Sequence, residues 1–177
     1  MFKLELSLAQ RASIRAMHTI DNPVTVDKPE FYAQLRAQLA SLLAGEHDLI
    51  ANAANTAALL YHALPEVNWA GFYFLHGTEL VLGPFQGQPA CVRIALGKGV
   101  CGTAAQTGQT QLVPDVHEFP GHIACDAASR SELVIPLRKC AALIGVLDLD
   151  STRAGRFEPA DRAGCESLAE VFLAALD

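Results

Sequence analysis

The amino-acid sequence predicts one α+β domain, in which a central, mainly antiparallel sheet of about six strands is flanked by helices. Its 177 residues are 51% hydrophobic and 18% charged, which is typical of a compact chain that buries a core. Two helical patterns come first, short strand-like segments fill the middle, and a helical pattern closes the chain. This order favours an α+β fold with the helices packed on one face of the sheet.

Two helices are expected before the first strand. Asp27 belongs to a residue type that caps helices, and residues 28–44 carry apolar residues at helical spacing. A second helix runs to about Leu64 and ends before Pro65. Residues 1–27 are interpreted as an N-terminal arm of unknown role, and residues 28–177 as the domain that carries the active site.

Strand-forming residues dominate the middle of the chain. Strands are expected at residues 69–75, 79–82 and 92–94, with a loop at residues 83–87. A short helix follows at residues 100–106, and a long irregular segment spans residues 113–130. Irregular segments of that length commonly carry function. The last helix is expected from about Pro159 to Leu176.

The clearest strand pair is a hairpin of residues 133–137 and 143–150. Because side chains alternate along a strand, Asp148 and Asp150 project from the same face. A turn centred between residues 139 and 140 would place Glu132 opposite Leu147, within reach of Asp148. Such a group of carboxylates is either a solvated strand end or a cradle for a ligand's ammonium group and a source of protons.

Charge and hydropathy narrow the classes of function. The net charge is -6 at pH 7, so nucleic acid, which requires a basic patch, is not an expected partner. No apolar run approaches the roughly 20 residues that span a bilayer, so no membrane partner is expected. Without a recognisable secretion or transit signal, we expect a cytoplasmic protein.

Five cysteines lie at positions 91, 101, 125, 140 and 165 without any C-x-x-C pair. This spacing excludes the usual structural zinc site and the thioredoxin-like motif. Cys125 lies in the long irregular segment near His117 and His122, so it is either a thiolate nucleophile or an inert buried thiol. These three residues have the ligand types of zinc but lack an evident fourth ligand, and no metal is expected there.

Two further cysteines suit a resolving thiol, which converts a sulfenic acid to a disulfide. Cys101 lies at the predicted start of a helix after Lys98, where the helix dipole and the lysine are expected to lower the pKa of the thiol. Cys91 lies in a loop. Cys140, in a hairpin turn, and Cys165, in the last helix, are interpreted as incidental.

Trp69 and Tyr73 are four residues apart on one predicted strand and therefore share a face. Packing in the core is the usual reason for such a pair, and lining of a ligand pocket is the alternative. Their polar atoms suit either position.

Several of these stretches resemble the free methionine-R-sulfoxide reductases, a family with a GAF-domain fold. The matching segments are residues 51–55, 68–73, 82–87, 89–91, 97–103, 114–132 and 145–151. The resemblance extends from about residue 28 to the C-terminus, and Cys91, Cys101 and Cys125 fall where the family has its three cysteines.

The resemblance implies thiol-dependent reduction of free L-methionine-(R)-sulfoxide to methionine. Cys125 would attack the sulfoxide sulfur and become a sulfenic acid, and Cys91 or Cys101 would then form a disulfide with it. Thioredoxin, supplied by NADPH and thioredoxin reductase, would restore the thiols, and no bound cofactor is expected. Because GAF modules commonly dimerise, a homodimer is compatible with this interpretation.

The resemblance also implies roles for the substrate-binding residues. Glu132, Asp148 and Asp150 would hold the substrate ammonium and assist protonation of the oxygen. Trp69 and Tyr73 would line the methyl and sulfur end, and backbone N–H groups of Ile123, Ala124 and Cys125 would receive the carboxylate. Since a peptide-bound residue lacks both charges, only the free amino acid should fit.

Two other functions remain open from the sequence. One is a GAF sensor that binds a small ligand such as a cyclic nucleotide. The other is a redox sensor in which the three cysteines form a regulatory disulfide without turnover. Steady consumption of electrons from thioredoxin would distinguish the enzyme from both.

Overall fold

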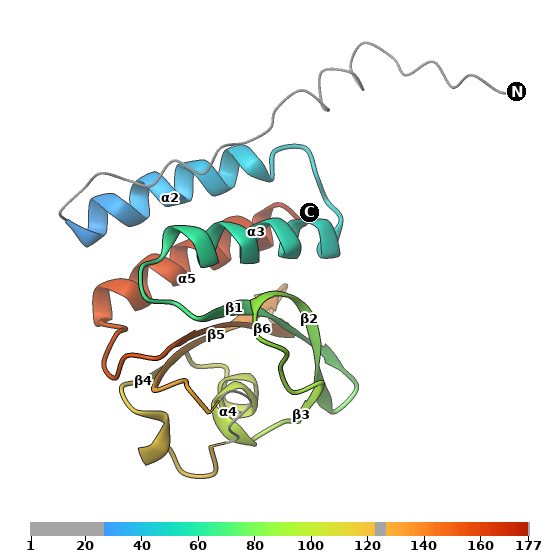
Figure 1. Cartoon of the computed structure of the whole chain (residues 1–177). Coiled ribbons are helices and arrows are strands. Elements are labelled where there is room, and N and C mark those ends of the chain that lie inside the picture. Colours follow the sequence, from blue (N-terminus) through green and yellow to red (C-terminus); the bar gives the residue numbers. More distant parts are fainter. Residues whose placement is uncertain (1–26, 123–126, 177) are drawn as a thin grey trace, which may run out of the picture.

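The computed structural model describes residues 27–122 and 127–176. The predicted N-terminal arm therefore lies outside the described residues, except for Asp27. The described chain forms one six-stranded antiparallel sheet with helices on both sides (Figure 1). This arrangement confirms the predicted α+β fold.

Neighbouring strands in the sheet follow the order β3-β2-β1-β6-β5-β4. The central pair, β1 and β6, is therefore brought together from distant parts of the sequence. The strands are β1 (Trp69–His76), β2 (Glu79–Gly87), β3 (Arg93–Ala95), β4 (Gln111–Val113), β5 (Ser131–Lys139) and β6 (Ala142–Ser151).

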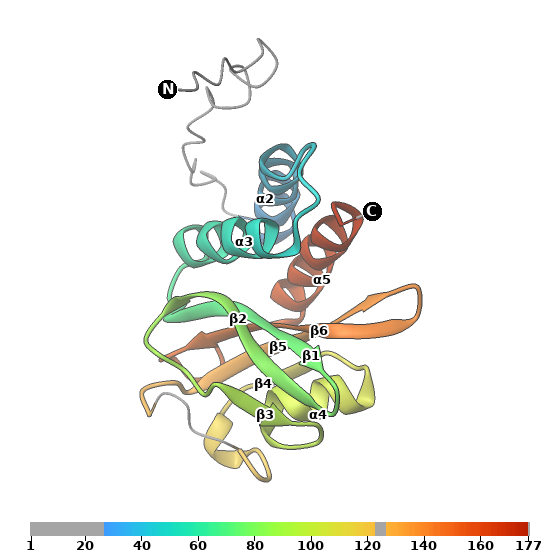
Figure 2. The same ribbon diagram turned by 90° about the vertical axis from the view of Figure 1, so that its right-hand side faces the viewer.

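The helices form two unequal layers. Helices α2 (Lys28–Leu42), α3 (Leu49–Ala63) and α5 (Pro159–Ala174) cover one face, with α2 packed on α5 and farthest from the sheet (Figure 2). Helix α4 (Gly99–Thr107) covers the opposite face, where it contacts β5 and β6. The expectation that all helices pack on one face is therefore wrong for α4.

Successive side chains along each strand point to opposite faces of the sheet, so each face has its own hydrophobic core. Phe72, Phe74 and Leu133 point toward α2, α3 and α5. Tyr73 and Val134, at the intervening positions, point toward α4. The central strands are thus buried on both faces, so the polar residues of β5 and β6 on the α4 side lie inside the protein rather than in solvent.

Strand β2 continues through residues 83–87, which the sequence predicts as a loop. This stretch pairs with β1, whereas β3 pairs only with Glu79–Val81, so the other edge of β2 at Pro84 has no β3 partner. Because proline lacks a backbone N–H, it is tolerated at such an edge. The segment predicted as irregular, residues 113–130, begins at the last residue of β4 and contains a short 3-10 helix, η1 (Val116–Glu118).

The β5–β6 hairpin is confirmed, but its predicted register is wrong. The two-residue turn consists of Cys140 and Ala141, both with positive φ (49° and 67°), instead of being centred one position earlier. An irregularity after Leu137 adds a further shift. As a result, Glu132 pairs with Asp150 and not with Leu147. The correction brings a second carboxylate directly beside Glu132.

None of the helices in residues 27–122 and 127–176 is long and apolar enough to cross a membrane.

The contact between α2 and α5 depends on a glycine. A Cβ atom at Gly164 would overlap the ring of Tyr32, whose hydroxyl donates a 2.8 Å hydrogen bond to Asp161. We expect Gly164→Ala to lower the free energy of unfolding by about 2 kcal/mol, because overpacking outweighs the gain in helix propensity of about 1 kcal/mol. Urea denaturation measures the change.

The exposed neighbour Ala163 provides the matched control. Ala163→Gly should lower the free energy of unfolding by about 1 kcal/mol, the difference in helix propensity between alanine and glycine. If Gly164→Ala were as stable as the parent protein, the predicted overlap between a Cβ atom at residue 164 and the Tyr32 ring would be wrong.

Candidate active site

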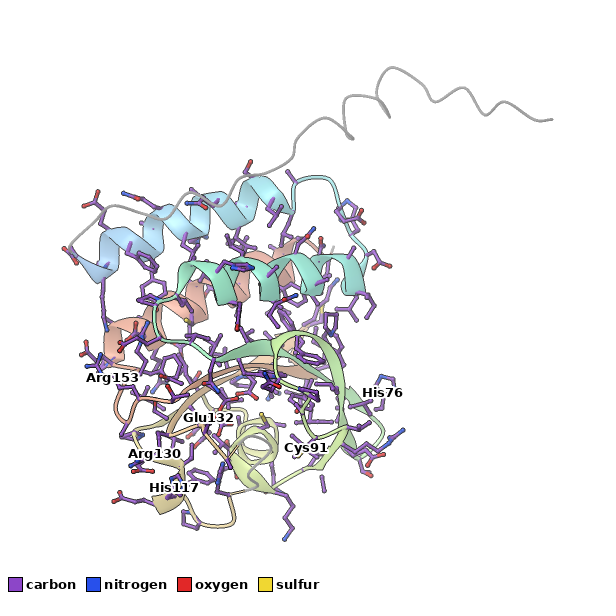
Figure 3. The ribbon with its side chains drawn as sticks, viewed as in Figure 1. His76, Cys91, His117, Arg130, Glu132 and Arg153 are labelled. Atoms are coloured by element: carbon purple, nitrogen blue, oxygen red, sulfur yellow. The ribbon has the colours of Figure 1, made fainter. Side chains whose placement is uncertain are left out.

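A cavity of about 40 Å³ lies between the sheet and α4. Its polar lining includes Glu132 from β5 and Asp148 and Asp150 from β6. Trp69 and Tyr73 of β1 supply an aromatic side, and Cys101 of α4 faces the acidic residues. Glu132 and Cys91 both lie on the α4 side of the sheet (Figure 3). The structure therefore brings together the carboxylates and aromatics that the sequence singled out.

The acidic residues are held by backbone pairing. Glu132 lies beside Asp150 across the hairpin, and Asp148 lies beside Val134 on the same face. Glu132 and Asp148 are only 6% and 5% exposed. The Cys101 thiol lies 3.8 Å from Glu132 Oε1, and Asp148 Oδ1 has no hydrogen-bond partner among the described residues. The interpretation as a solvated strand end is therefore wrong for Glu132 and Asp148.

Burial controls the protonation of this cluster. Desolvation raises the pKa of Glu132 well above its usual value, and the charges of Asp148 and Asp150 raise it further. Desolvation also raises the pKa of Asp148, against hydrogen bonds from Cys101 and Glu132 that lower it. The pair therefore keeps a proton at pH values where exposed carboxyls have lost theirs. Such a group can protonate a bound oxygen atom or neutralise a cation.

The Cys101 thiol has the opposite character from the one predicted. Cys101 does lie in the first turn of α4, but it is only 4% exposed. Burial raises the pKa of the thiol well above its usual value, and the neighbouring Asp148 and Glu132 charges add to the effect. These costs outweigh the helix dipole, so Cys101 is a neutral thiol near pH 7.

The cysteines differ in oxidation state. Cys91 takes part in a disulfide, whereas Cys101, Cys140 and Cys165 are free. Cys165 is buried against Tyr32 in the helical layer, and Cys140 is exposed at the hairpin turn. Neither residue reaches the cavity. Cys125 lies outside the described residues, as do Ile123 and Ala124, so the nucleophile and the carboxylate contacts stay predictions.

Stacked rings form the apolar side of the cavity. Trp69 lies 5.9 Å from Tyr73 and 5.3 Å from Phe85, both nearly parallel to it. The Trp69 indole N–H donates a 3.1 Å hydrogen bond to the carbonyl oxygen of Gln88, which fixes the ring. Trp69 and Tyr73 thus belong to the core and also line the cavity, so both interpretations of this pair hold.

Sequence reasoning missed Ser129 and Gln88, which also line the cavity. Ser129 is 5% exposed and accepts a 3.2 Å hydrogen bond from the Asn68 side chain. A small polar residue in a long segment carries no pattern of its own, and the only available signal was the position of Ser129 just before Glu132. His122 also lines the cavity, where burial and the nearby His117 lower its pKa.

Comparisons with known proteins agree on fold and family. The sequence profile of the GAF domain matches residues 31–176. The chain is 56% identical over 143 residues to the free methionine-R-sulfoxide reductase of Escherichia coli, covering 81% of this chain and 87% of that protein. Among solved structures, the free methionine-R-sulfoxide reductase of Neisseria meningitidis in complex with its substrate matches with a TM-score of 0.86 and 42% identity, covering 90% and 96% of the two chains.

A second solved structure is described differently. A putative GAF sensor protein from Burkholderia vietnamiensis is 66% identical, with a TM-score of 0.81 and coverage of 84% of this chain and 94% of that one. A similar protein is therefore also described as a sensor. The chemistry of the cavity has to distinguish the sensor interpretation from the reductase interpretation.

The buried carboxyl of Asp148 should make stability fall with rising pH. Its pKa is raised from 3.8 to about 7. At low pH the group is protonated in both the folded and the unfolded chain, and between these two values only the unfolded chain gains by ionising. Asp148→Asn should therefore raise the free energy of unfolding by about 2 kcal/mol at pH ~8 and change it little at pH ~4. Urea denaturation at both pH values tests this.

Asp115→Asn is the control, with the opposite sign. Arg130 donates a 2.6 Å hydrogen bond to Asp115 and, together with the amide and ring of His117, holds the pKa of this carboxyl below its usual value. Loss of that carboxylate should lower stability at neutral pH and have a smaller effect in acid. If Asp148→Asn behaved like Asp115→Asn, the folded state would hold Asp148 as a stabilised anion.

Proposed function

We propose that this chain, which belongs to the free methionine-R-sulfoxide reductase family of GAF-domain proteins, reduces free L-methionine-(R)-sulfoxide to L-methionine. The observation that carries the proposal is the buried cluster of Glu132 and Asp148 beside the stacked Trp69 and Tyr73. It offers negative charge and protons next to an apolar surface. A zwitterion with a polar sulfoxide and an apolar methyl group needs all of these.

The carboxylates would act in two ways. Ionised oxygens hold the substrate ammonium, and a carboxyl with a raised pKa donates a proton to the sulfoxide oxygen. Protonation makes the sulfur electrophilic, so the Cys125 thiolate can attack it. Oxygen then passes to the cysteine sulfur, which becomes a sulfenic acid, and the sulfoxide leaves as the thioether methionine.

We assign the resolving role to Cys91 rather than Cys101. Cys91 already takes part in a disulfide, while Cys101 is a buried thiol with a raised pKa. Attack on the sulfenic acid by the Cys91 thiolate forms a disulfide and releases water. Thioredoxin, reduced by NADPH through thioredoxin reductase, would then return the two electrons.

The acidic lining argues against a cyclic-nucleotide sensor. A phosphate beside Glu132 and Asp148 would meet like charges in a desolvated site. The lining includes one lysine, Lys98, against the three carboxyl groups of Glu132, Asp148 and Asp150, and no Arg side chain lines the cavity among the described residues. An ammonium group meets the opposite sign. The cavity thus favours a cationic or zwitterionic ligand over a nucleotide.

The first test follows NADPH oxidation with thioredoxin and thioredoxin reductase. We expect turnover with free methionine-R-sulfoxide, and little with its S epimer or with the N-acetylated R sulfoxide. Loss of the ammonium charge would leave buried carboxylates unpaired, at a cost of about 1–3 kcal/mol or more. Equal turnover of the acetylated compound would contradict the role of the carboxylates, and no turnover at all would favour the sensor.

The cysteine roles are separated by single-turnover methionine release from pre-reduced protein. Cys125→Ser should release none, whereas Cys91→Ser should still release about one equivalent per chain but fail to recycle with thioredoxin. Cys140→Ser and Cys165→Ser are matched controls that should keep full turnover. A full equivalent from Cys125→Ser, or normal recycling by Cys91→Ser, would contradict the assignment.

A further inference from the structure

Three metal-ligating side chains meet on the α4 side of the sheet. Cys101 of α4, Glu132 of β5 and Asp148 of β6 each place one ligand atom within 4.8 Å of the other two. All three are buried, with exposed fractions of 4%, 6% and 5%. We propose that this cluster binds a thiophilic divalent cation, Zn²⁺ above all.

The unpaired oxygen of Asp148 indicates that the cluster is prepared for a ligand. Asp148 lines the cavity and is more than nine-tenths buried, yet its Oδ1 atom has no hydrogen-bond partner among the described residues. A buried polar atom without a partner costs about 1–3 kcal/mol. Coordination to a cation removes that cost and also the repulsion between the two carboxylates.

The donor set selects the type of cation. Thiolate sulfur and carboxylate oxygen are both zinc ligand types, and three protein ligands leave the fourth tetrahedral position for a water. Mg²⁺ and Ca²⁺ prefer six or more oxygen ligands, and a thiolate does not suit them. The cavity of about 40 Å³ has room for roughly three waters, enough for an ion that keeps one or two of them.

The site does not depend on the oxidation state of Cys91. Cys101 is free while Cys91 takes part in a disulfide, so the oxidised protein keeps all three ligands. If the proposed function holds, the cation occupies the place of the substrate ammonium and competes with free methionine sulfoxide. The binding itself does not rest on that function.

Cd²⁺ reports on the site through its thiolate charge-transfer absorption in the ultraviolet. The oxidised full-length protein, without added thiol, should show this band with about one Cd²⁺ per chain, and Zn²⁺ should displace it. Cys101→Ser should abolish the band. Glu132→Gln and Asp148→Asn should keep the thiolate band but weaken Cd²⁺ affinity about tenfold or more.

Matched variants locate the thiolate. Cys140→Ser and Cys165→Ser remove the other free thiols and should leave the band and its stoichiometry unchanged. A band that survives Cys101→Ser, or one that disappears in Cys140→Ser, would overturn the site. Normal Cd²⁺ affinity in both Glu132→Gln and Asp148→Asn would overturn it as well.

A separate measurement distinguishes the site from the proposed function. Zn²⁺ should slow methionine release by pre-reduced protein in a single turnover, and excess methionine-R-sulfoxide should reverse the effect. Cd²⁺ binding that passes the variant tests without any such competition would support the cation site and contradict the placement of the substrate ammonium.

Discussion

The burial of acidic side chains on one face of the sheet is the constraint on which the site depends. Glu132 and Asp148 come from adjacent strands and are covered by α4, so they are shielded from bulk water. Lys98 and His122 also line the cavity, but neither forms an ion pair with these two carboxyls among the described residues. A buried charge without a partner is costly, and the folded protein meets that cost by holding protons. A positively charged group that entered the cavity would replace those protons and form an ionic interaction with the carboxylates.

The helical layer shows how the same chain treats a buried carboxylate that serves stability. Asp161 is 1% exposed, but it contacts Lys28 at 2.7 Å, Arg156 at 3.1 Å and the Tyr32 hydroxyl at 2.8 Å. These partners lower its pKa in spite of burial. Asp148 is 5% exposed and has no such ion pair among the described residues, and desolvation raises its pKa. The cationic partners of Asp161 stabilise its ionised form, whereas desolvation is the main influence on Asp148. A buried carboxyl with a raised pKa in a cavity is a candidate for a functional role.

Much of this arrangement follows from the sequence, because strand alternation is local. The shared face of Trp69 and Tyr73, and that of Asp148 and Asp150, needed only the two-residue period. The prediction of the hairpin register was wrong because Cys140 and Ala141 form the turn with positive φ. Such a turn usually contains glycine or asparagine, and neither residue type is present here. The prediction of a lowered pKa for the Cys101 thiol was wrong for a different reason. The position of Cys101 in a helix can be predicted from the sequence, but its burial against Glu132 and Asp148 depends on tertiary packing.

The same electrostatics supports the proposed division of roles between Cys91 and Cys101. A resolving thiol has to reach the thiolate state, and the neighbourhood of Glu132 and Asp148 opposes a second negative charge at Cys101. Cys91 lies outside that buried group and is partly exposed. A cation in the cluster would reverse the balance at Cys101, since it stabilises the thiolate and both carboxylates at once. The chemistry available to Cys101 therefore depends on which positive charge the cavity holds, an ammonium group or a metal ion.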